Sequence, residues 1–356
     1  MALWRWVSKR FLRDRKSKKM PERRLVDEAL THVIILDGTM SRLEPGYQSH
    51  ARMAYDLLKA ANSKGVFLHY QRGLQFKDRS YASAMAVLAG RGIDLQIQQA
   101  YGALASRYRP GDKIFLLGYS RGAYAVRSLG GIIDRVGLLT REHATQRNVN
   151  MAYRLYRNGS VSEIAQCFIR EKCHHSTQIT AIGVWDTVKA LGIRVPLIWR
   201  IFAGRHKFHN DQIGSSVCNG FQALALDEMR TAFKPVMWSA PPNWAGSLEQ
   251  KWFRGNHSDI GGQTFGAAIS RPLSNIPFVW VMQQLQSRGL LLAEGWDFEI
   301  SQDVNAPSTG NWRGLQKFFL ARSRREVGRY PSERIHSSVP KNGLGRLAYL
   351  HDNTSG

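Results

Sequence analysis

The sequence has too few cysteines for a disulfide framework and no apolar run long enough to span a membrane. The cysteines are odd in number, and even with the neighbouring His174 and His175 they follow no standard metal-binding spacing: Cys167, Cys173 and Cys218. No stretch approaches the ~20 consecutive apolar residues that a membrane helix requires. These absences argue against a disulfide-rich or membrane-spanning protein, and no motif indicates a metal ion or a cofactor.

Acidic residues are scarce relative to basic ones. The chain has 27 Asp and Glu against 50 Lys and Arg, a formal net charge of +23 at pH 7. Such a surplus favours anionic partners, such as phospholipid head groups, nucleic acid or an acidic protein. No recognisable nucleic-acid-binding motif accompanies the charge, which argues against nucleic acid as the partner.

Residues 1–24 form a strongly basic segment, with ten basic residues against two acidic ones and a local net charge of +8. As a helix the segment would have an apolar side beside a basic one, which is typical of a helix lying on an anionic membrane. A solvated basic tail is an equally good interpretation. No apolar core follows the basic residues, so we expect no secretory signal and a cytoplasmic location, with or without membrane association.

From residue 31 the sequence alternates apolar runs with helix-like stretches, which is the βαβ rhythm of a mostly parallel sheet. Apolar runs predict buried strands over 32–36, 66–70, 113–118, 179–185 and 250–253. Periodic stretches predict helices over 47–63, 93–108, 123–136, 222–233 and 275–288, and residues 234–238 are expected to begin a further strand. The predicted fold class is α/β, with a mostly parallel central sheet, helices on both faces and helical insertions over its carboxyl edge.

The expected domain organisation follows from these patterns. Residues 1–28 are set apart as a basic amphipathic segment, and 29–300 as one catalytic domain. That domain is expected to carry insertions at 140–178 and 190–222. A basic extension over 301–356 is expected to pack on the domain or to trail it.

Ser120 lies in the sequence Gly-Tyr-Ser-Arg-Gly, between a predicted strand and a predicted helix. Gly118 and Gly122 allow a sharp turn without a Cβ clash. The turn places the serine hydroxyl at a helix N-terminus, where a developing oxyanion is stabilised. The pattern predicts a nucleophilic serine.

A serine nucleophile requires a base and an orienting acid, expected in the chain order Ser, acid, His. Asp186 and His257 each follow an apolar strand in that order, and polar groups at strand ends cluster at the carboxyl edge of a parallel sheet. Asp259 is the alternative acid, although a residue two positions after the histidine is less well placed. Other histidines, including His50 and His206, fit the order or the strand ends less well.

The oxyanion hole is expected to use two main-chain N–H groups. One belongs to Arg121, directly after the nucleophile, and the other to Gly38 or Thr39, in the loop after the first strand. The carboxylate of Asp37 would repel an oxyanion, so we expect it to hydrogen-bond main chain and shape the turn. The side chains of Arg121 and Arg72 either bind a phosphate or carboxylate or brace the elbow through an ion pair, and bracing is slightly favoured.

Five sequence blocks in one order resemble the DUF2235 family, which includes the catalytic domain of type VI secretion phospholipase effectors of the Tle1 kind. These blocks are residues 36–39, 118–124, 183–188, 223–228 and 252–262. The resemblance implies an α/β-hydrolase fold and phospholipase A activity on glycerophospholipids. By matching blocks, it makes Ser120 the nucleophile, Asp186 the acid and His257 the base, as the chain order does.

The sequence therefore favours a serine hydrolase that cleaves a carboxylic ester of a lipid or phospholipid. We expect no counterpart here of the large extra domain of the secreted effectors, so a toxin role is not expected from the resemblance. A peptidase or small-ester esterase is not separated from a lipase by sequence. The alternative of a different class is a basic protein that binds nucleic acid or a membrane surface on a hydrolase scaffold with an idle site.

Overall fold

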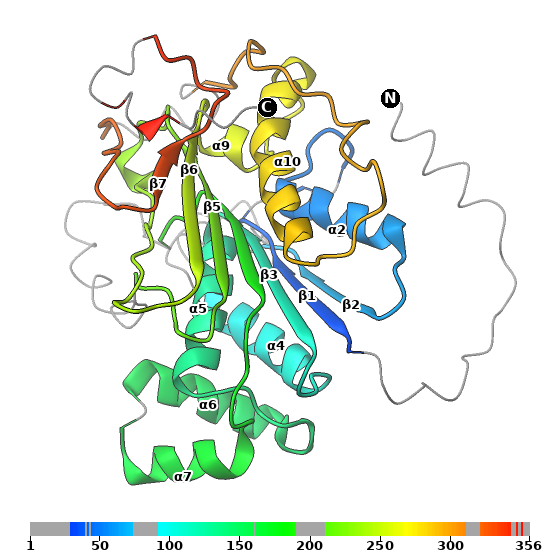
Figure 1. Ribbon diagram of the computed structural model, residues 1–356, viewed down its shortest axis with the longest axis vertical. Helices are drawn as coiled ribbons and strands as arrows, with labels where there is room; N and C mark the ends of the chain where they lie inside the picture. The colour runs from blue at the N-terminus through cyan, green and yellow to red at the C-terminus, as the bar shows by residue number, and fades with distance from the viewer. Residues whose placement is uncertain are drawn as a thin grey trace, which may run out of the picture.

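A parallel sheet forms the centre of the molecule (Figure 1). The computed structural model describes residues 29–39, 41–42, 44–73, 92–159, 161–189, 211–310, 321–342, 347 and 350–351. Within these residues the sheet has seven strands in the order β2-β1-β3-β4-β5-β6-β7, and every neighbouring pair is parallel. The strands are β1 (Thr31–Leu36), β2 (Val66–Gln71), β3 (Lys113–Tyr119), β4 (Ala181–Trp185), β5 (Asn219–Ala225), β6 (Ser247–Phe253) and β7 (Glu333–Ile335). The predicted α/β fold class with a parallel sheet is confirmed.

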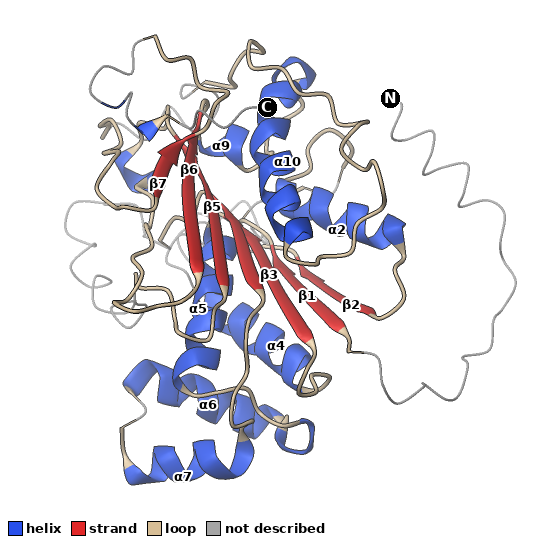
Figure 2. Cartoon of the chain, in the orientation of Figure 1, coloured by secondary structure: helices blue, strands red, loops and turns tan. Residues whose placement is uncertain are grey.

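Helices cover both faces of this sheet (Figure 2). On one face lie α4 (Ile93–Ala105) and α5 (Arg121–Arg135), and on the other α2 (His50–Ala61) and α10 (Arg271–Ser287). Successive side chains of a strand point to opposite faces, so β1, β3 and β4 contribute buried side chains to the cores on both faces.

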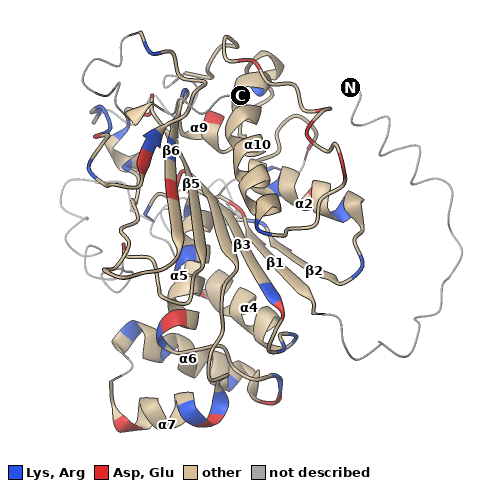
Figure 3. Cartoon of the chain, viewed as in Figure 1, with Lys and Arg blue, Asp and Glu red and all other residues tan. Residues whose placement is uncertain are grey.

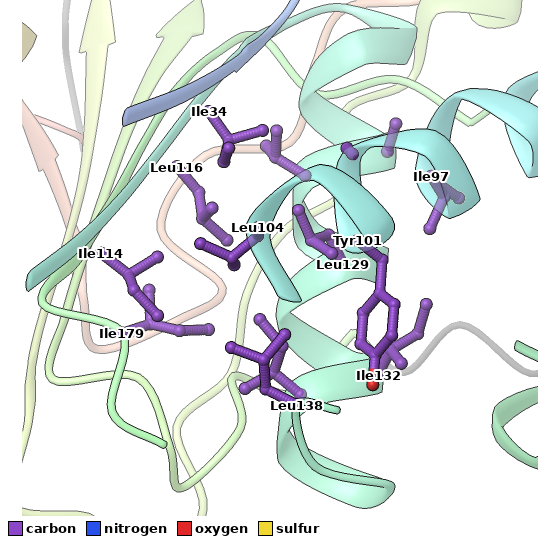
Figure 4. Close-up of a cluster of buried hydrophobic side chains, with 14 of the residues drawn as sticks. Ile34, Ile97, Tyr101, Leu104, Ile114, Leu116, Leu129, Ile132, Leu138 and Ile179 are labelled. Atoms are coloured by element: carbon purple, nitrogen blue, oxygen red, sulfur yellow. The ribbon is translucent and has the colours of Figure 1, made fainter. Parts of the chain in front are cut away.

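The alternation is visible along β1. Ile34 and Leu36 belong to the core under α4 and α5. Figure 4 shows Ile34 in this core with Leu104 and Leu129. The intervening residues of the strand point to the opposite core, under α2 and α10. Because both faces are buried, the strand reads in sequence as one continuous apolar run rather than as a polar–apolar alternation.

The expected helical insertion over 140–178 contains α6 (Gln146–Asn158) and α7 (Glu163–Lys172). Each helix begins at a hydroxyl cap. Thr145 accepts the N–H of Asn148 in α6, and Ser162 caps α7 in the same way.

The position of this insertion differs from the expectation. Its buried face packs on α4 and α5, where Val149 lies against Gly102 and Tyr156 against Gly131. These contacts place α6 and α7 at the end of the molecule opposite the short helix α9 (His257–Ile260) (Figure 1). The insertion is therefore not over the carboxyl edge of the sheet, because Gly102 and Gly131, in the C-terminal halves of α4 and α5, leave room for side chains of α6.

The helix expected over 222–233 is wrong, because β5 occupies Asn219–Ala225 in the centre of the sheet. Alanine and leucine favour helices, and a strand buried on both faces shows no alternation, so a short apolar run of this kind is ambiguous. The strand expected over 234–238 is also absent, since within the described residues Pro235 forms only an isolated bridge, to Val188.

The C-terminal segment 301–356, which the sequence set apart as an extension, contributes to the sheet. Strand β7 lies within 301–356 and pairs with β6, so this segment supplies an edge strand of the sheet. The carboxylate of Glu333 in β7 is buried and accepts a hydrogen bond from Nε1 of Trp252 in β6, at 2.8 Å. The basic segment 1–28 lies outside the described residues, as does most of the second insertion, 190–210.

Helix α7 carries charges of both signs, whereas the charged residues of α6 are all arginines: Arg147, Arg154 and Arg157 (Figure 3). Within the described part of the chain, none of the helices combines the length and the apolar character needed to cross a bilayer.

Candidate active site

The nucleophile elbow expected at Ser120 is a strained turn between β3 and α5. The backbone of Ser120 has φ 57° and ψ −120°, a conformation that non-glycine residues rarely adopt. The chain also passes very close to neighbouring strands. A Cβ on Gly122 would lie 2.1 Å from the main-chain oxygen of Leu36, and one on Gly118 would lie 2.7 Å from the oxygen of Gly122. Both glycines are therefore required by packing.

Three side chains far apart in sequence form one hydrogen-bonded chain at the carboxyl edge. Nε2 of His257 lies 2.8 Å from Oγ of Ser120, and its Nδ1 lies 2.5 Å from Oδ2 of Asp186. Ser120 follows β3, Asp186 follows β4 and His257 follows β6. The structure thus brings together the three residues that chain order selected.

Asp186 is fully buried and its carboxylate is engaged on every side. Oδ1 accepts the N–H of Ala225 at 3.0 Å, and both oxygens accept from the guanidinium of Arg325. Burial by itself would raise the pKa of Asp186, but the charge of Arg325 and the hydrogen bonds from His257 and Arg325 lower it well below its usual range. Asp186 is therefore ionised at neutral pH.

Sequence reasoning missed Arg325. It lies among many arginines in a basic stretch, and no local pattern distinguishes it from its neighbours. Only the fold brings it to Asp186, which it follows by 139 residues.

His257 is enclosed by aromatic and acidic neighbours. Its ring lies 5.0 Å from that of Tyr119 and 4.9 Å from that of Phe233, and its main-chain N–H donates to Oε2 of Glu228 at 3.1 Å. Burial lowers the pKa of His257 below its ordinary value, although the neighbouring Asp186 raises it. The imidazole is therefore neutral near pH 7 and able to accept a proton.

Asp259, the alternative acid, has a different set of partners. Its carboxylate accepts hydrogen bonds from the N–H of Asn256 at 3.0 Å, the hydroxyl of Ser308 at 2.5 Å and the N–H of Thr309 at 3.0 Å. With Asn256 it forms a capping box at the start of α9. The carboxylate that contacts the ring of His257 is thus that of Asp186, and Asp259 fastens the loop that carries the histidine.

The loop after β1 lies beside the serine, as expected. A Cβ on Gly38 would lie 3.2 Å from Cβ of Ser120. The carboxylate of Asp37 accepts from Ser49 and Tyr70 at 2.7 Å, and from the N–H of Gly38 at 2.6 Å. Asp37 therefore shapes the turn and accepts the N–H of Gly38, which leaves the N–H of Thr39 as the remaining one of the two expected oxyanion donors.

The two arginines near the elbow lie in different settings. Arg121 is the first residue of α5, and burial lowers its pKa to about 10. Arg72 donates from Nε to the main-chain oxygen of Ser41 at 2.9 Å, so it braces a loop through backbone.

His50, which the sequence disfavoured as the catalytic base, makes structural contacts near His257. Nδ1 of His50 lies 2.8 Å from the main-chain oxygen of Ile260, at the end of α9, and Nε2 lies 3.2 Å from Oγ of Ser274. His50 therefore ties α2 to the segment that carries His257. His206, by contrast, lies outside the described residues.

A parallel sheet with a strained serine between strand and helix, and with histidine and aspartate at the same edge, defines an α/β-hydrolase fold. A family model described as "T6SS, Phospholipase effector Tle1-like, catalytic domain" matches residues 31–284. The chain belongs to this family. The family resemblance inferred from the sequence blocks is confirmed, and at the level of the family the domain is that of a lipid ester hydrolase.

Individual relatives are more distant. "Uncharacterized protein YEL023C" of Saccharomyces cerevisiae is 26% identical over 237 residues, which cover 59% of this chain and 33% of that protein. A crystal structure of an uncharacterized protein from Pseudomonas aeruginosa aligns with 78% of this chain and 49% of its own, with 13% identity and a TM-score of 0.43. The Tle1 effector bound to the VgrG spike of the type 6 secretion system aligns with 70% of this chain and 54% of its own, with 20% identity and a TM-score of 0.35. The chain thus spans between a third and just over half of the length of these proteins.

Proposed function

We propose that this protein is a serine esterase that cleaves a carboxylic ester of a phospholipid through an acyl-enzyme. The observation that carries the proposal is the continuous hydrogen-bonded chain from Ser120 through His257 to Asp186. It lies in a chain that matches the family model of the Tle1-like phospholipase effector catalytic domain.

Each group has a role that follows from its position. Neutral His257 removes the proton of Ser120 through Nε2, and the serine oxygen attacks the ester carbonyl. Ionised Asp186 accepts the Nδ1–H of His257, fixes its tautomer and stabilises the imidazolium that forms. The main-chain N–H groups of Arg121 and Thr39 donate to the oxyanion. His257 then returns the proton to the leaving alcohol and activates the water that releases the acyl group.

The test of this proposal is the variant S120A. Because the serine oxygen is the attacking atom, S120A is expected to lose fluorophosphonate labelling and to lower hydrolysis of phospholipid esters to background, while circular dichroism and thermal unfolding stay as in the wild type. The assay compares phospholipids with neutral lipids and short-chain esters, which separates a phospholipase from a general esterase. Labelling of S120A at the wild-type rate would contradict the proposal, and salt-dependent DNA binding without turnover on any ester would favour the idle-site alternative.

We further propose that the basic segment 1–24 brings the enzyme to anionic membranes. Its local charge of +8 is the supporting observation, since each basic residue near an anionic surface contributes about 1 kcal/mol of binding free energy. Replacing Lys16, Lys18, Lys19 and Arg23 by glutamine is expected to weaken binding to phosphatidylserine-containing vesicles at least about tenfold at low salt. Co-sedimentation measures the binding, with phosphatidylcholine vesicles as control. Equal binding of the variant and the wild type would remove this role.

A further inference from the structure

The carboxylate of Asp186 lies against the buried guanidinium of Arg325. Nη1 of Arg325 lies 2.5 Å from Oδ1 of Asp186, and Nη2 lies 2.9 Å from Oδ2. The same guanidinium donates to the main-chain oxygens of Ala225 at 2.9 Å and of Phe233 at 2.6 Å. The side chain of Arg325 is only 4% exposed and that of Asp186 is fully buried. This is a two-pronged contact out of water, for which the planar fork of arginine is suited and a lysine is not.

These contacts connect the parts of the fold that surround His257. Ala225 ends β5 and donates its own N–H to Asp186, while the ring of Phe233 packs on that of His257. Arg325 therefore holds the carboxylate and the aromatic wall beside the histidine in one fixed arrangement.

We propose that Arg325 is a positioning residue for the hydrolysis, which orients Asp186 toward His257 and keeps Asp186 ionised while His257 is neutral. The inference rests on the proposed function and names a group that deepens it. A buried carboxylate and a histidine in contact share their last proton as a pair. A fixed positive charge makes the pair lose that proton at lower pH, whichever side chain carries it. Arg325 thus extends to lower pH the range in which His257 is neutral and can accept the proton of Ser120.

The other titratable groups around His257 do not supply a net positive charge of this kind. Glu228 accepts the main-chain N–H of His257, but its carboxylate is paired with Arg230, with Nη2 to Oε2 at 2.6 Å. The two charges largely cancel at the histidine. Tyr119 donates its hydroxyl to the main-chain oxygen of His257, and burial raises the pKa of this phenol well above its ordinary value, so it is uncharged.

Arg325 lies outside residues 31–284, the part of the chain that the family model matches. The segment that supplies it also supplies β7, which anchors the segment to the sheet. The family domain of this protein therefore receives the group that holds its carboxylate from the chain that follows it.

The test compares R325M, R325K and the control R324Q, which removes the adjacent, exposed arginine. The readouts are the pH dependence of kcat/KM and of fluorophosphonate labelling, together with thermal unfolding. R325M is expected to move the acid limb upward by about one pH unit or more, and to lower the maximal rate roughly 10²-fold because the carboxylate is no longer held. R325K keeps the charge, so its acid limb stays near that of the wild type while its maximal rate falls. R324Q is expected to match the wild type in both.

Three outcomes would overturn the proposal: an acid limb in R325M that matches R324Q, an acid limb in R325K that moves as far as that in R325M, or an unchanged maximal rate in both. R325Q, which keeps donor groups without the charge, replaces R325M if the latter does not fold. S120A distinguishes the two proposals. If S120A is labelled like the wild type, the proposed function fails. An NMR titration of His257, which requires no turnover, still reports the effect of Arg325, and an unchanged midpoint in R325M contradicts it.

Discussion

Individual side chains at the carboxyl edge are distinguished by their hydrogen-bond partners more than by their residue types. Asp186 and Asp259 are both buried carboxylates close to His257 in the fold, yet one contacts the imidazole and the other contacts loop main chain. Ser120, Asp186 and His257, which chain order selected, lie together because each follows a strand of one parallel sheet. Arg325 had no such signal, since its role arises only when two distant loops meet.

This difference between the two carboxylates gives a prediction for D186N. Loss of the charge and of the correct histidine tautomer is expected to lower kcat about 10³- to 10⁴-fold, and the unfolding free energy is expected to fall as well, because the buried guanidinium of Arg325 loses its charged partner. D259N, the matched control, is expected to keep kcat within about tenfold while losing about 1–3 kcal/mol of unfolding free energy, because three hydrogen bonds to the loop are weakened. Steady-state kinetics and urea unfolding measure the two effects. Equal losses of kcat in both variants would contradict the assignment.

At the level of helices and strands, the sequence predicted some strands of the sheet and missed others. The apolar runs of β1, β3 and β4 were predictable from sequence, because strands buried on both faces are continuous in apolar character. The strand β5 was mispredicted as a helix for the same reason. It is buried on both faces and shows no polar–apolar alternation, and its alanines and leucine favour helices. Propensity is local, whereas the identity of a central strand is decided by its neighbours.

The packing of α5 on β1 predicts that G122A is strongly destabilising. Its Cβ would lie 2.1 Å from the main-chain oxygen of Leu36, so α5 must move away from β1. Overpacking of this kind costs about 1–3 kcal/mol or more of unfolding free energy, and labelling of Ser120 is expected to fall with it. G102A in α4 is the matched control, since its Cβ meets only Val149 at 3.4 Å, and a helical Gly-to-Ala change is expected to stabilise by about 0.5–1 kcal/mol. Urea unfolding that shows the same stability for both variants would be inconsistent with this packing.

For the molecule as a whole, pH enters through histidines that are buried in neutral form. Burial lowers the pKa of His50 well below its ordinary value of 6.5, and it lowers that of His257 as well. Below pH 6.5 the unfolded chain therefore binds more protons than the folded one, so the unfolding free energy falls as pH falls. Each such histidine contributes up to about 1.4 kcal/mol per pH unit between 6.5 and its folded pKa.

The prediction is a marked loss of unfolding free energy between pH 7 and pH 5, measured by urea denaturation. H50N is expected to be less stable than the wild type at pH 7, because the contacts to Ile260 and Ser274 are lost. Its stability should nevertheless depend less steeply on pH, since one titrating group is gone. H175N, which removes an exposed histidine, is expected to keep the wild-type slope. A wild-type unfolding free energy that is constant over this range would refute the argument.

The contact between Asp186 and Arg325 also has a consequence for biosynthesis. Translation proceeds from the N-terminus, so a growing chain contains Ser120, Asp186 and His257 before the ribosome has added Arg325, 139 residues after Asp186. Such a nascent chain carries the nucleophile and the base without the guanidinium that holds their acid. In the proposed mechanism, full hydrolytic capacity therefore requires that this late segment has emerged from the ribosome and docked on the sheet.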